Sequence, residues 1–270
     1  MRYRIKEEKT LSGIISYDVY RENIGVITLN RPEAANALNR SLLTSLKKKL
    51  DELNKDSSLR CLLLTGEGIK AFSAGADLKE REKMSNKEVT EFVRQISDVV
   101  STIENMKVPT IAVMNGIAYG GGLELALGCD LRIAAEDIRV CLPETSLGII
   151  PGAGGTQRLT RLIGIGQTKK LIFSAKPIYS PEAHALGMIE EITERHHLFT
   201  NALHLAETIA NNAPIAIQQA KLAINEGMHM SIHEGLQVEQ KCYQQIIPTE
   251  DRLEGLHAFK EKRTPIYKGK

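Results

Sequence analysis

The chain has 270 residues, a length that suits one main core with a smaller appendage rather than two full domains. Its 35 basic and 33 acidic residues leave a formal net charge of +2, which argues against a protein that coats nucleic acid through charge alone. No stretch approaches the roughly 18 uninterrupted apolar residues of a membrane span, and residues 1–8 lack an apolar core of signal-peptide length. We expect a soluble, untargeted protein with no membrane partner.

The first half of the chain alternates between strand and helix signals. Residues 24–29 predict a strand that ends before Arg31-Pro32. Further short apolar runs at 61–64, 110–114 and 131–134 are each followed by a turn or a helix, which is typical of an α/β core. An amphipathic helix follows the first strand, with its apolar face formed by Leu38, Leu42, Leu43, Leu46, Leu50 and Leu53.

The second half begins with a capped helix and then becomes wholly helical. Ser180 is expected to cap a helix with Pro181 at its first position and Gly187 at its end, before a short strand at 188–192. This organisation predicts a core domain at 1–197 and a helical region at 198–270. The helices of that region are expected near 197–211, 214–226, 232–246 and 249–262.

Three successive glycines, at 120–122, precede the acid Glu124. Glycines let main-chain N–H groups approach a ligand closely, and residues 123–127 predict a short apolar helix closed by Gly128. At a helix N-terminus, the Gly121 amide could therefore hold the oxygen of a polarised carbonyl group. The alternative is a tight strand-to-helix junction with no ligand.

Two further small-residue loops and a second acid strengthen the first interpretation. Residues 71–79 leave the apolar run at 61–64, and residues 150–159 open a helix for which Thr156 is a candidate N-cap. Glu144 follows Pro143, twenty positions after Glu124. Taken singly, each acid could be structural, either favouring a helix dipole or forming a surface salt bridge. Together with the loops, the two carboxylates indicate acyl chemistry.

These three loops resemble those of the crotonase superfamily, the enoyl-CoA hydratase/isomerase group, and the resemblance covers nearly the whole chain. It implies an α/β fold in which repeated ββα units form a spiral, followed by a C-terminal helical trimerisation region. Residues 248–263 are similar to the helices that build trimers, and commonly dimers of trimers, in the family. A homotrimer or homohexamer is therefore expected.

The resemblance also implies roles for particular residues. The amides of Ala76 and Gly121 match the family's oxyanion hole, Glu124 the group that deprotonates water, and Glu144 the group that protonates the α-carbon. Both acids together are typical of hydratases, which add water to a 2-enoyl-CoA thioester without a cofactor beyond the coenzyme A of the substrate. Isomerase, decarboxylase and thioesterase chemistry on a CoA thioester remain alternatives. Further substrate-binding candidates are Ala74, Asp77, Leu78, Lys79, Gly152 and Ala153.

Residues 76–84 and 262–270 resemble one subgroup, whose hydratase acts on 3-methylglutaconyl-CoA in leucine breakdown and is also described as binding AU-rich RNA. Fatty acid metabolism is the wider setting of the family. An RNA-binding function would depend on the basic residues around one helix, and that helix has no aromatic side chain for stacking. A solubilising face is the favoured interpretation, so nucleic acid is not expected as a partner. The basic residues are Lys47, Lys48, Lys49, Lys55 and Arg60.

Cysteines and histidines suggest no special chemistry. The four cysteines, Cys61, Cys129, Cys141 and Cys242, show no paired spacing and fit reduced thiols of a cytoplasmic protein, or of the mitochondrial matrix for a processed eukaryotic chain. No metal site is expected, because the histidines lack ligand spacing with a carboxylate, apart from an ambiguous pair at i, i+4. The histidines considered are His184, His196, His197, His257 and the pair His229 and His233.

Overall fold

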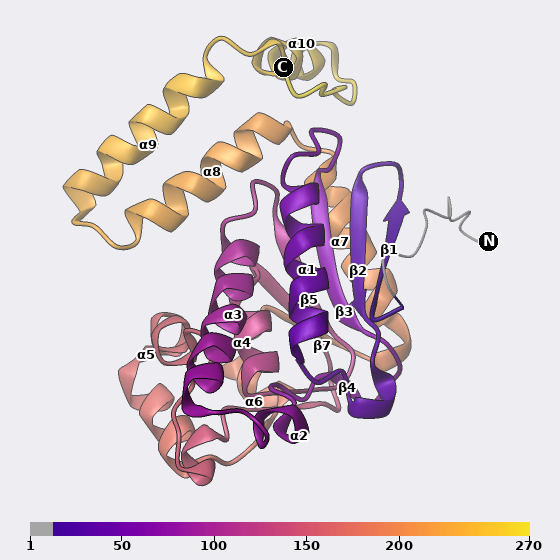
Figure 1. Cartoon of the computed structure of the whole chain (residues 1–270). Helices are drawn as coiled ribbons and strands as arrows, with labels where there is room; N and C mark the ends of the chain where they lie inside the picture. Colours follow the sequence, from indigo (N-terminus) through magenta and orange to yellow (C-terminus); the bar gives the residue numbers. More distant parts are fainter. Residues whose placement is uncertain (1–12) are drawn as a thin grey trace.

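Two sheets form the framework of the computed structural model, which describes residues 13–270 (Figure 1). The residues considered in the search for a signal peptide lie outside this range. The larger sheet has the strand order β1-β2-β3-β5-β7-β10 and the smaller one β4-β6-β8-β9. Neighbouring strands are parallel except in the pairs β1–β2 and β8–β9. The strands are β1 (Ile15–Tyr20), β2 (Ile24–Leu29), β3 (Cys61–Gly66), β4 (Ala71–Ser73), β5 (Thr110–Met114), β6 (Ile117–Tyr119), β7 (Leu131–Ala135), β8 (Arg139–Cys141), β9 (Ile178–Tyr179) and β10 (Glu191–Thr193).

Consecutive strands alternate between the two sheets, and helices follow each pair. β3, β5 and β7 belong to the larger sheet, whereas β4, β6 and β8 belong to the smaller one. This alternation confirms the expected spiral of ββα units. The helices are α1 (Arg40–Leu53), α2 (Leu78–Arg81), α3 (Asn86–Glu104), α4 (Gly121–Gly128), α5 (Gly155–Ser174), α6 (Ser180–Ala185), α7 (Leu198–Ala210), α8 (Pro214–Gly227), α9 (Ile232–Ile246) and α10 (Glu250–Glu261), with 3-10 turns η1 (Pro32–Ala34), η2 (Glu144–Leu147) and η3 (Arg195–His197).

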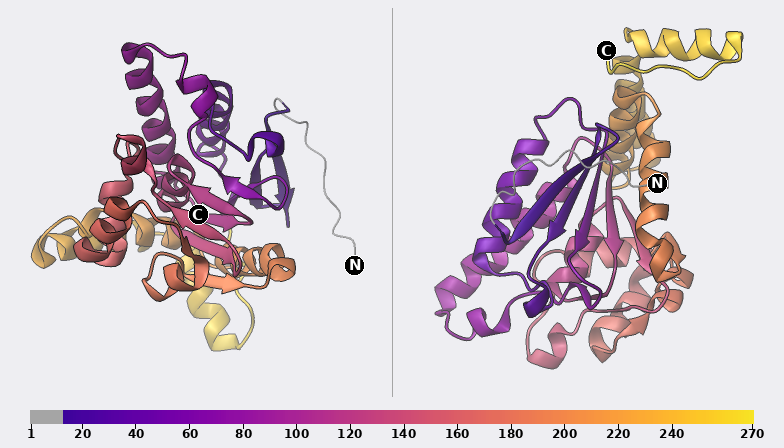
Figure 2. Two further views of the ribbon diagram at one scale, coloured as in Figure 1. Left: turned by 90° about the horizontal axis from the view of Figure 1, so that it is seen from below. Right: turned by 90° about the vertical axis from the view of Figure 1, so that its right-hand side faces the viewer.

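Helices cover both faces of the larger sheet. α1 and α3 pack against each other on one face, and α7 lies across the opposite face (Figure 2). α1 buries the leucines that recur at helical spacing, and its N-cap Asn39 accepts a hydrogen bond from the Leu42 amide. α3 begins with a capping box in which Ser85 and Glu88 satisfy each other's backbone amides. Both helices are therefore amphipathic elements with defined starts.

Three local expectations are wrong. Thr156 is not an N-cap, because α5 begins one residue earlier with Gly154 at the cap position and φ 99°. Ser180 makes no capping bond; its hydroxyl donates instead to the buried carbonyl of Ala135 at 2.8 Å. The strand expected at 188–192 begins later, at Glu191. For Ser180, a contact with a distant segment replaced the local pattern.

The four C-terminal helices lie where the sequence predicts them. α8 and α9 form a hairpin that extends away from the sheets, with α10 beyond it (Figures 1 and 2). α7 differs from the other three because its buried face, including Leu198 and Leu203, belongs to the main core. The domain boundary at 197/198 stays a prediction, but α7 packs as part of the first unit. Among residues 13–270, no helix combines the length and apolar character needed to cross a bilayer.

Candidate active site

Three loops of the smaller sheet meet at one edge. β4, β6 and β8 are parallel neighbours, so the segments that follow them emerge on the same side. Those segments carry Ala76 after β4, Gly121 after β6 and Glu144 after β8. The topology therefore brings together residues that are up to 68 positions apart in sequence.

The amides of Ala76 and Gly121 lie close together. A Cβ built on Gly121 would be 3.8 Å from the Ala76 nitrogen, and one built on Gly75 would be 3.1 Å from the Gly121 nitrogen. The bridge between Leu38 and Ala76 uses the carbonyl of Gly75 and the amide of Asp77. Among the described residues, neither the Ala76 nor the Gly121 amide has an acceptor, so both are available to a ligand oxygen.

Glycine is required where these loops touch. Gly75 has φ 86°, and a Cβ there would lie 2.5 Å from the Tyr119 carbonyl oxygen. Gly120 has φ 51°, and its Cβ would lie 2.9 Å from the Glu144 Oε1 atom. A side chain at either position would push the loops apart, since both conformations are left-handed and both spaces are filled.

Glu124 is buried in the first turn of α4, with 3% of its surface exposed. Its Oε1 atom accepts hydrogen bonds from the amides of Ala153 and Gly155, both at 2.8 Å. Burial raises the pKa of Glu124, and the two amide bonds and the nearby Arg158 oppose that rise. The carboxylate is thus held in one orientation by backbone donors.

Glu144 is buried at the start of η2, and it differs from Glu124 in its bonding. Its Oε2 atom is buried without a hydrogen-bond partner among the described residues. Burial, followed by the negative charge of Glu124, raises the pKa of Glu144 to about 7, while Arg81 and a bond to its own backbone lower it. A buried unpaired oxygen is costly, which suggests a site that a ligand or water completes.

The chain matches a known family over almost its whole length. The family model described as enoyl-CoA hydratase/isomerase matches residues 20–270. The chain belongs to this family. Human mitochondrial methylglutaconyl-CoA hydratase is 47% identical over 269 residues, which cover 97% of this chain and 79% of that protein. YngF of Bacillus subtilis, named for the same family, is 50% identical over 255 residues, covering 94% of this chain and 98% of that protein.

Solved structures of the family share the fold. An enoyl-CoA hydratase from Bacillus anthracis superimposes with a TM-score of 0.94 at 49% identity, covering 95% of this chain and all of that one. The crotonase-type fold is thereby confirmed, as is the expectation of an enzyme of the enoyl-CoA hydratase type. In the present chain, the three loops form the candidate active site.

A groove runs along the outside of the first loop. Its volume is about 900 Å³, and Ala74, Ala76, Leu78 and Lys79 line it. Its charged lining is mixed, with the basic residues Arg31, Arg40, Lys79 and Lys83 and the acidic residues Glu33, Asp77, Glu80 and Glu88. The groove therefore joins the free Ala76 amide to a surface of mixed charge on which Lys79 is one basic side chain.

Asp77 and Arg31 fix the shape of this loop. The Asp77 carboxylate accepts from the amides of Lys79 and Glu80 at 3.2 and 3.4 Å, and from the Arg31 guanidinium at 3.0 Å. Arg31 also donates to the Ala37 carbonyl. Asp77 thus fixes the conformation of the loop that presents the Ala76 amide.

The third small-residue loop, at residues 150–159, contacts the Glu124 side chain through its backbone amides. Ala153 is buried and donates its amide to Glu124, whereas Gly152 is exposed beside Val93. Arg158 supports this loop by donating to the Ala153 carbonyl at 2.9 Å and forming a two-point ion pair with Glu104 at 3.0 and 2.6 Å. Sequence reasoning missed Arg158 and Glu104, because nothing in their spacing links α3 to α5.

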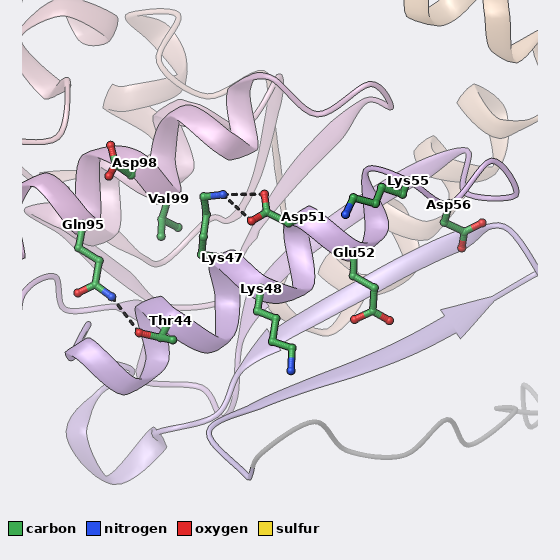
Figure 3. A pocket seen from close by; sticks show the side chains of 10 residues that line it. All are labelled: Thr44, Lys47, Lys48, Asp51, Glu52, Lys55, Asp56, Gln95, Asp98 and Val99. Atoms are coloured by element: carbon green, nitrogen blue, oxygen red, sulfur yellow. Dashed lines mark hydrogen bonds and ion pairs between the residues drawn. The ribbon is translucent and has the colours of Figure 1, made fainter.

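The basic side chains on α1 are mostly engaged with neighbouring acids. Lys47 contacts both Asp51 oxygens at 2.6 Å, and acidic residues line the same shallow pocket as Lys48 and Lys55 (Figure 3). Lys49 is buried, with its ammonium 4.5 Å from the Tyr17 ring centroid. This mixed-charge surface offers no continuous basic stripe for phosphates, so the RNA-binding hypothesis gains nothing from the structure.

Proposed function

We propose that the chain adds water across the 2,3 double bond of a 2-enoyl-CoA thioester, with the carbonyl oxygen held by the amides of Ala76 and Gly121. The observation that carries this proposal is the meeting of two free amides with two buried carboxylates at one sheet edge. Charge developing on the thioester oxygen would be stabilised there by fixed donors, and losing one such donor costs about 3 kcal/mol, or a hundredfold or more in rate.

We assign different roles to the two acids. Glu124 receives two amide hydrogen bonds that favour its charged form, which suits a base that orients and deprotonates water. Glu144 has a pKa of about 7 and a free buried oxygen, which suits an acid that protonates the α-carbon. Because the charges of the two groups interact, the pair titrates as a unit.

The substrate we propose is a short branched enoyl-CoA such as 3-methylglutaconyl-CoA, within leucine degradation. The human relative is named methylglutaconyl-CoA hydratase, and the resemblance extends over residues 76–84 and 262–270. The paired glutamates favour hydration over isomerase, decarboxylase or thioesterase chemistry. The groove beside Lys79 would take the coenzyme A part of the substrate, and Ala74, Asp77, Leu78, Gly152 and Ala153 would shape the path to the acids. No further cofactor is required by this scheme.

We further propose a homotrimer or homohexamer built through α8, α9 and α10. Large apolar side chains remain exposed on these helices, including Ile232 at 82% and Phe259 at 86%. For location we propose the cytoplasm or the mitochondrial matrix, since the human relative is named as mitochondrial. The four buried cysteines are free thiols in the structure, as in reducing compartments.

The test is turnover of crotonyl-CoA and 3-methylglutaconyl-CoA, followed by loss of the ultraviolet absorbance of the conjugated thioester. Glu124→Gln and Glu144→Gln should each lower turnover at least about a hundredfold, since each removes a proton-transfer group. Circular dichroism and solution mass serve as controls for folding. Near-normal turnover in a folded variant would exclude that residue from the mechanism, and an inactive wild type on both substrates would overturn the hydratase proposal.

A further inference from the structure

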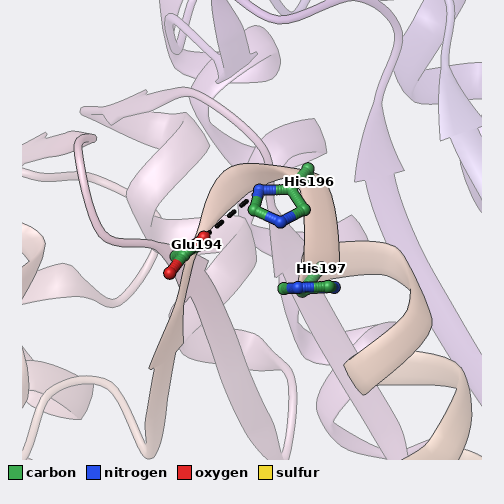
Figure 4. A group of neighbouring side chains, drawn as sticks. All are labelled: Glu194, His196 and His197. Atoms are coloured by element: carbon green, nitrogen blue, oxygen red, sulfur yellow. Dashed lines mark ion pairs between the residues drawn. The ribbon is translucent and has the colours of Figure 1, made fainter.

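Three potential metal ligands gather on the turn between β10 and α7. Glu194 follows β10, and His196 and His197 lie on η3 (Figure 4). The Nδ1 atom of His196 is 3.4 Å from Glu194 Oε2, and the two imidazole rings have centroids 3.9 Å apart. One ligand atom from each residue lies within 4.8 Å of the other two. Within residues 13–270, this is the one such group of three.

The geometry suits a small transition-metal ion. Two nitrogens and one carboxylate oxygen form a donor set typical of Zn²⁺, Ni²⁺ or Cu²⁺. Ligands about 2.1 Å from a tetrahedral ion are roughly 3.4 Å from one another. The Glu194–His196 pair already has this separation, and any wider pair needs to close by at most about 1.4 Å by this estimate. Both of those side chains are more than 60% exposed, so each has solvent around it in which to reorient.

The backbone of the turn is anchored, which reduces the ordering that an ion would have to impose. Arg195 lies between the ligands in sequence and donates to both Asp137 oxygens at 3.2 and 2.7 Å and to the carbonyls of Ile69 and Asn115. The His197 amide also donates to the Glu194 carbonyl at 2.9 Å. Asp137 compensates the charge of Arg195, so the guanidinium opposes a bound cation less.

We propose that Glu194, His196 and His197 form a surface site for one divalent transition-metal ion, such as Zn²⁺, which fastens the connection between β10 and α7. Water would occupy the remaining coordination positions, because all three ligands face solvent. The site contains none of the residues proposed for catalysis, so its role is structural. It revises the expectation, drawn from spacing alone, that His196 and His197 hold no metal.

The experiment uses the full chain without a histidine tag, stripped with a chelator and titrated with Zn²⁺ by isothermal calorimetry. We expect one ion per chain and a higher midpoint of thermal unfolding with Zn²⁺, since an ion that binds the folded state stabilises it. Glu194→Gln should weaken binding at least tenfold, and His196→Gln combined with His197→Gln should abolish it.

Two controls identify the ligands. His204→Gln, an exposed substitution on α7 outside the group, and the pair His229→Gln with His233→Gln should leave Zn²⁺ affinity unchanged. With Cu²⁺ as the probe, electron paramagnetic resonance should show two nitrogen ligands, reduced to one by His197→Gln. Absence of wild-type binding, or unchanged binding in the folded double variant of His196 and His197, would overturn the proposal. Hydratase turnover is measured separately, so failure of one proposal does not affect the other.

Discussion

At the residue scale, Glu144 is an ionisable group in an environment that disfavours its charged form. The carboxyl is buried beside another acid and has an oxygen without a partner among residues 13–270. Glu124 experiences similar burial, but the amides of Ala153 and Gly155 compensate part of its desolvation. Backbone donors and nearby charges together therefore give the two carboxyl groups different environments.

This difference predicts a pH dependence of stability. The pKa of Glu144 rises from 4.5 to about 7 on folding, so the folded state binds the extra proton between these values. Its favourable contribution is complete below pH 4.5 and is lost as the pH rises through about 7. Urea unfolding should be measured for the wild type and for Glu144→Gln. As the pH rises through this window, the free energy of unfolding of the wild type should fall relative to that of the variant by at most ~1.4 kcal/mol per pH unit. If the unfolding free energy of the wild type relative to the variant stays constant or rises with pH, the raised pKa of Glu144 would be contradicted.

At the element scale, the active site depends on the contact between the loops after β4 and β6. Gly75 in one loop touches the carbonyl of Tyr119 in the other, and this contact sets the separation of the two donor amides. The order of strands in the smaller sheet determines the approximate position of the two loops. The absence of a side chain at Gly75 lets the two loops approach closely enough to fix the final placement of the donor amides.

Gly75→Ala should therefore lower the turnover of 2-enoyl-CoA strongly, by about a hundredfold, because the Cβ would displace the Gly121 amide from the oxyanion position. The matched control is Gly164→Ala in α5, where φ is 77° but nothing lies within 4 Å of the added Cβ. Both variants should lose on the order of 1–3 kcal/mol of stability from backbone strain. Equal turnover in the two variants would show that the loop contact does not set the site.

Sequence reasoning succeeded or failed at this scale according to how local each feature is. The leucine spacing of α1 and the glycines at the two ends of α4 could be predicted because the relevant residues are close in sequence. The predicted cap at Ser180 failed because its hydroxyl found the Ala135 carbonyl, 45 positions away. Arg158 was missed for the same reason, since its partner Glu104 lies on another helix.

At the scale of the whole molecule, α8, α9 and α10 extend from the body and expose large apolar side chains. Hydrogen bonds and ion pairs tie the last residues of the chain back to α10, including the Lys268 amide to Asp251 and Arg263 to Glu254. The protruding region is thus internally ordered while its apolar surface is uncovered, as expected of an interface between copies.

Size-exclusion chromatography with light scattering should give three or six times the chain mass of 29.9 kDa. Phe259→Asp should shift the population toward smaller species, because it places a charge where the proposed interface would exclude water. Lys260→Asp, at the exposed neighbouring position, supplies the control for a change in charge. A wild type that elutes as a monomer, or a Phe259→Asp variant with unchanged mass, would count against assembly through α10.

The sequence by itself determined the class of fold, the C-terminal helices and the residues offered to the chemistry, because periodicity, glycine runs and motif resemblance are encoded in neighbouring positions. Only the tertiary structure decided that the Ala76 and Gly121 amides meet, that Glu144 is buried without a partner, and that Glu194, His196 and His197 share one turn surface. Burial, separation and protonation depend on atoms supplied by distant segments, and those are arranged only when the strands pair and the loops converge.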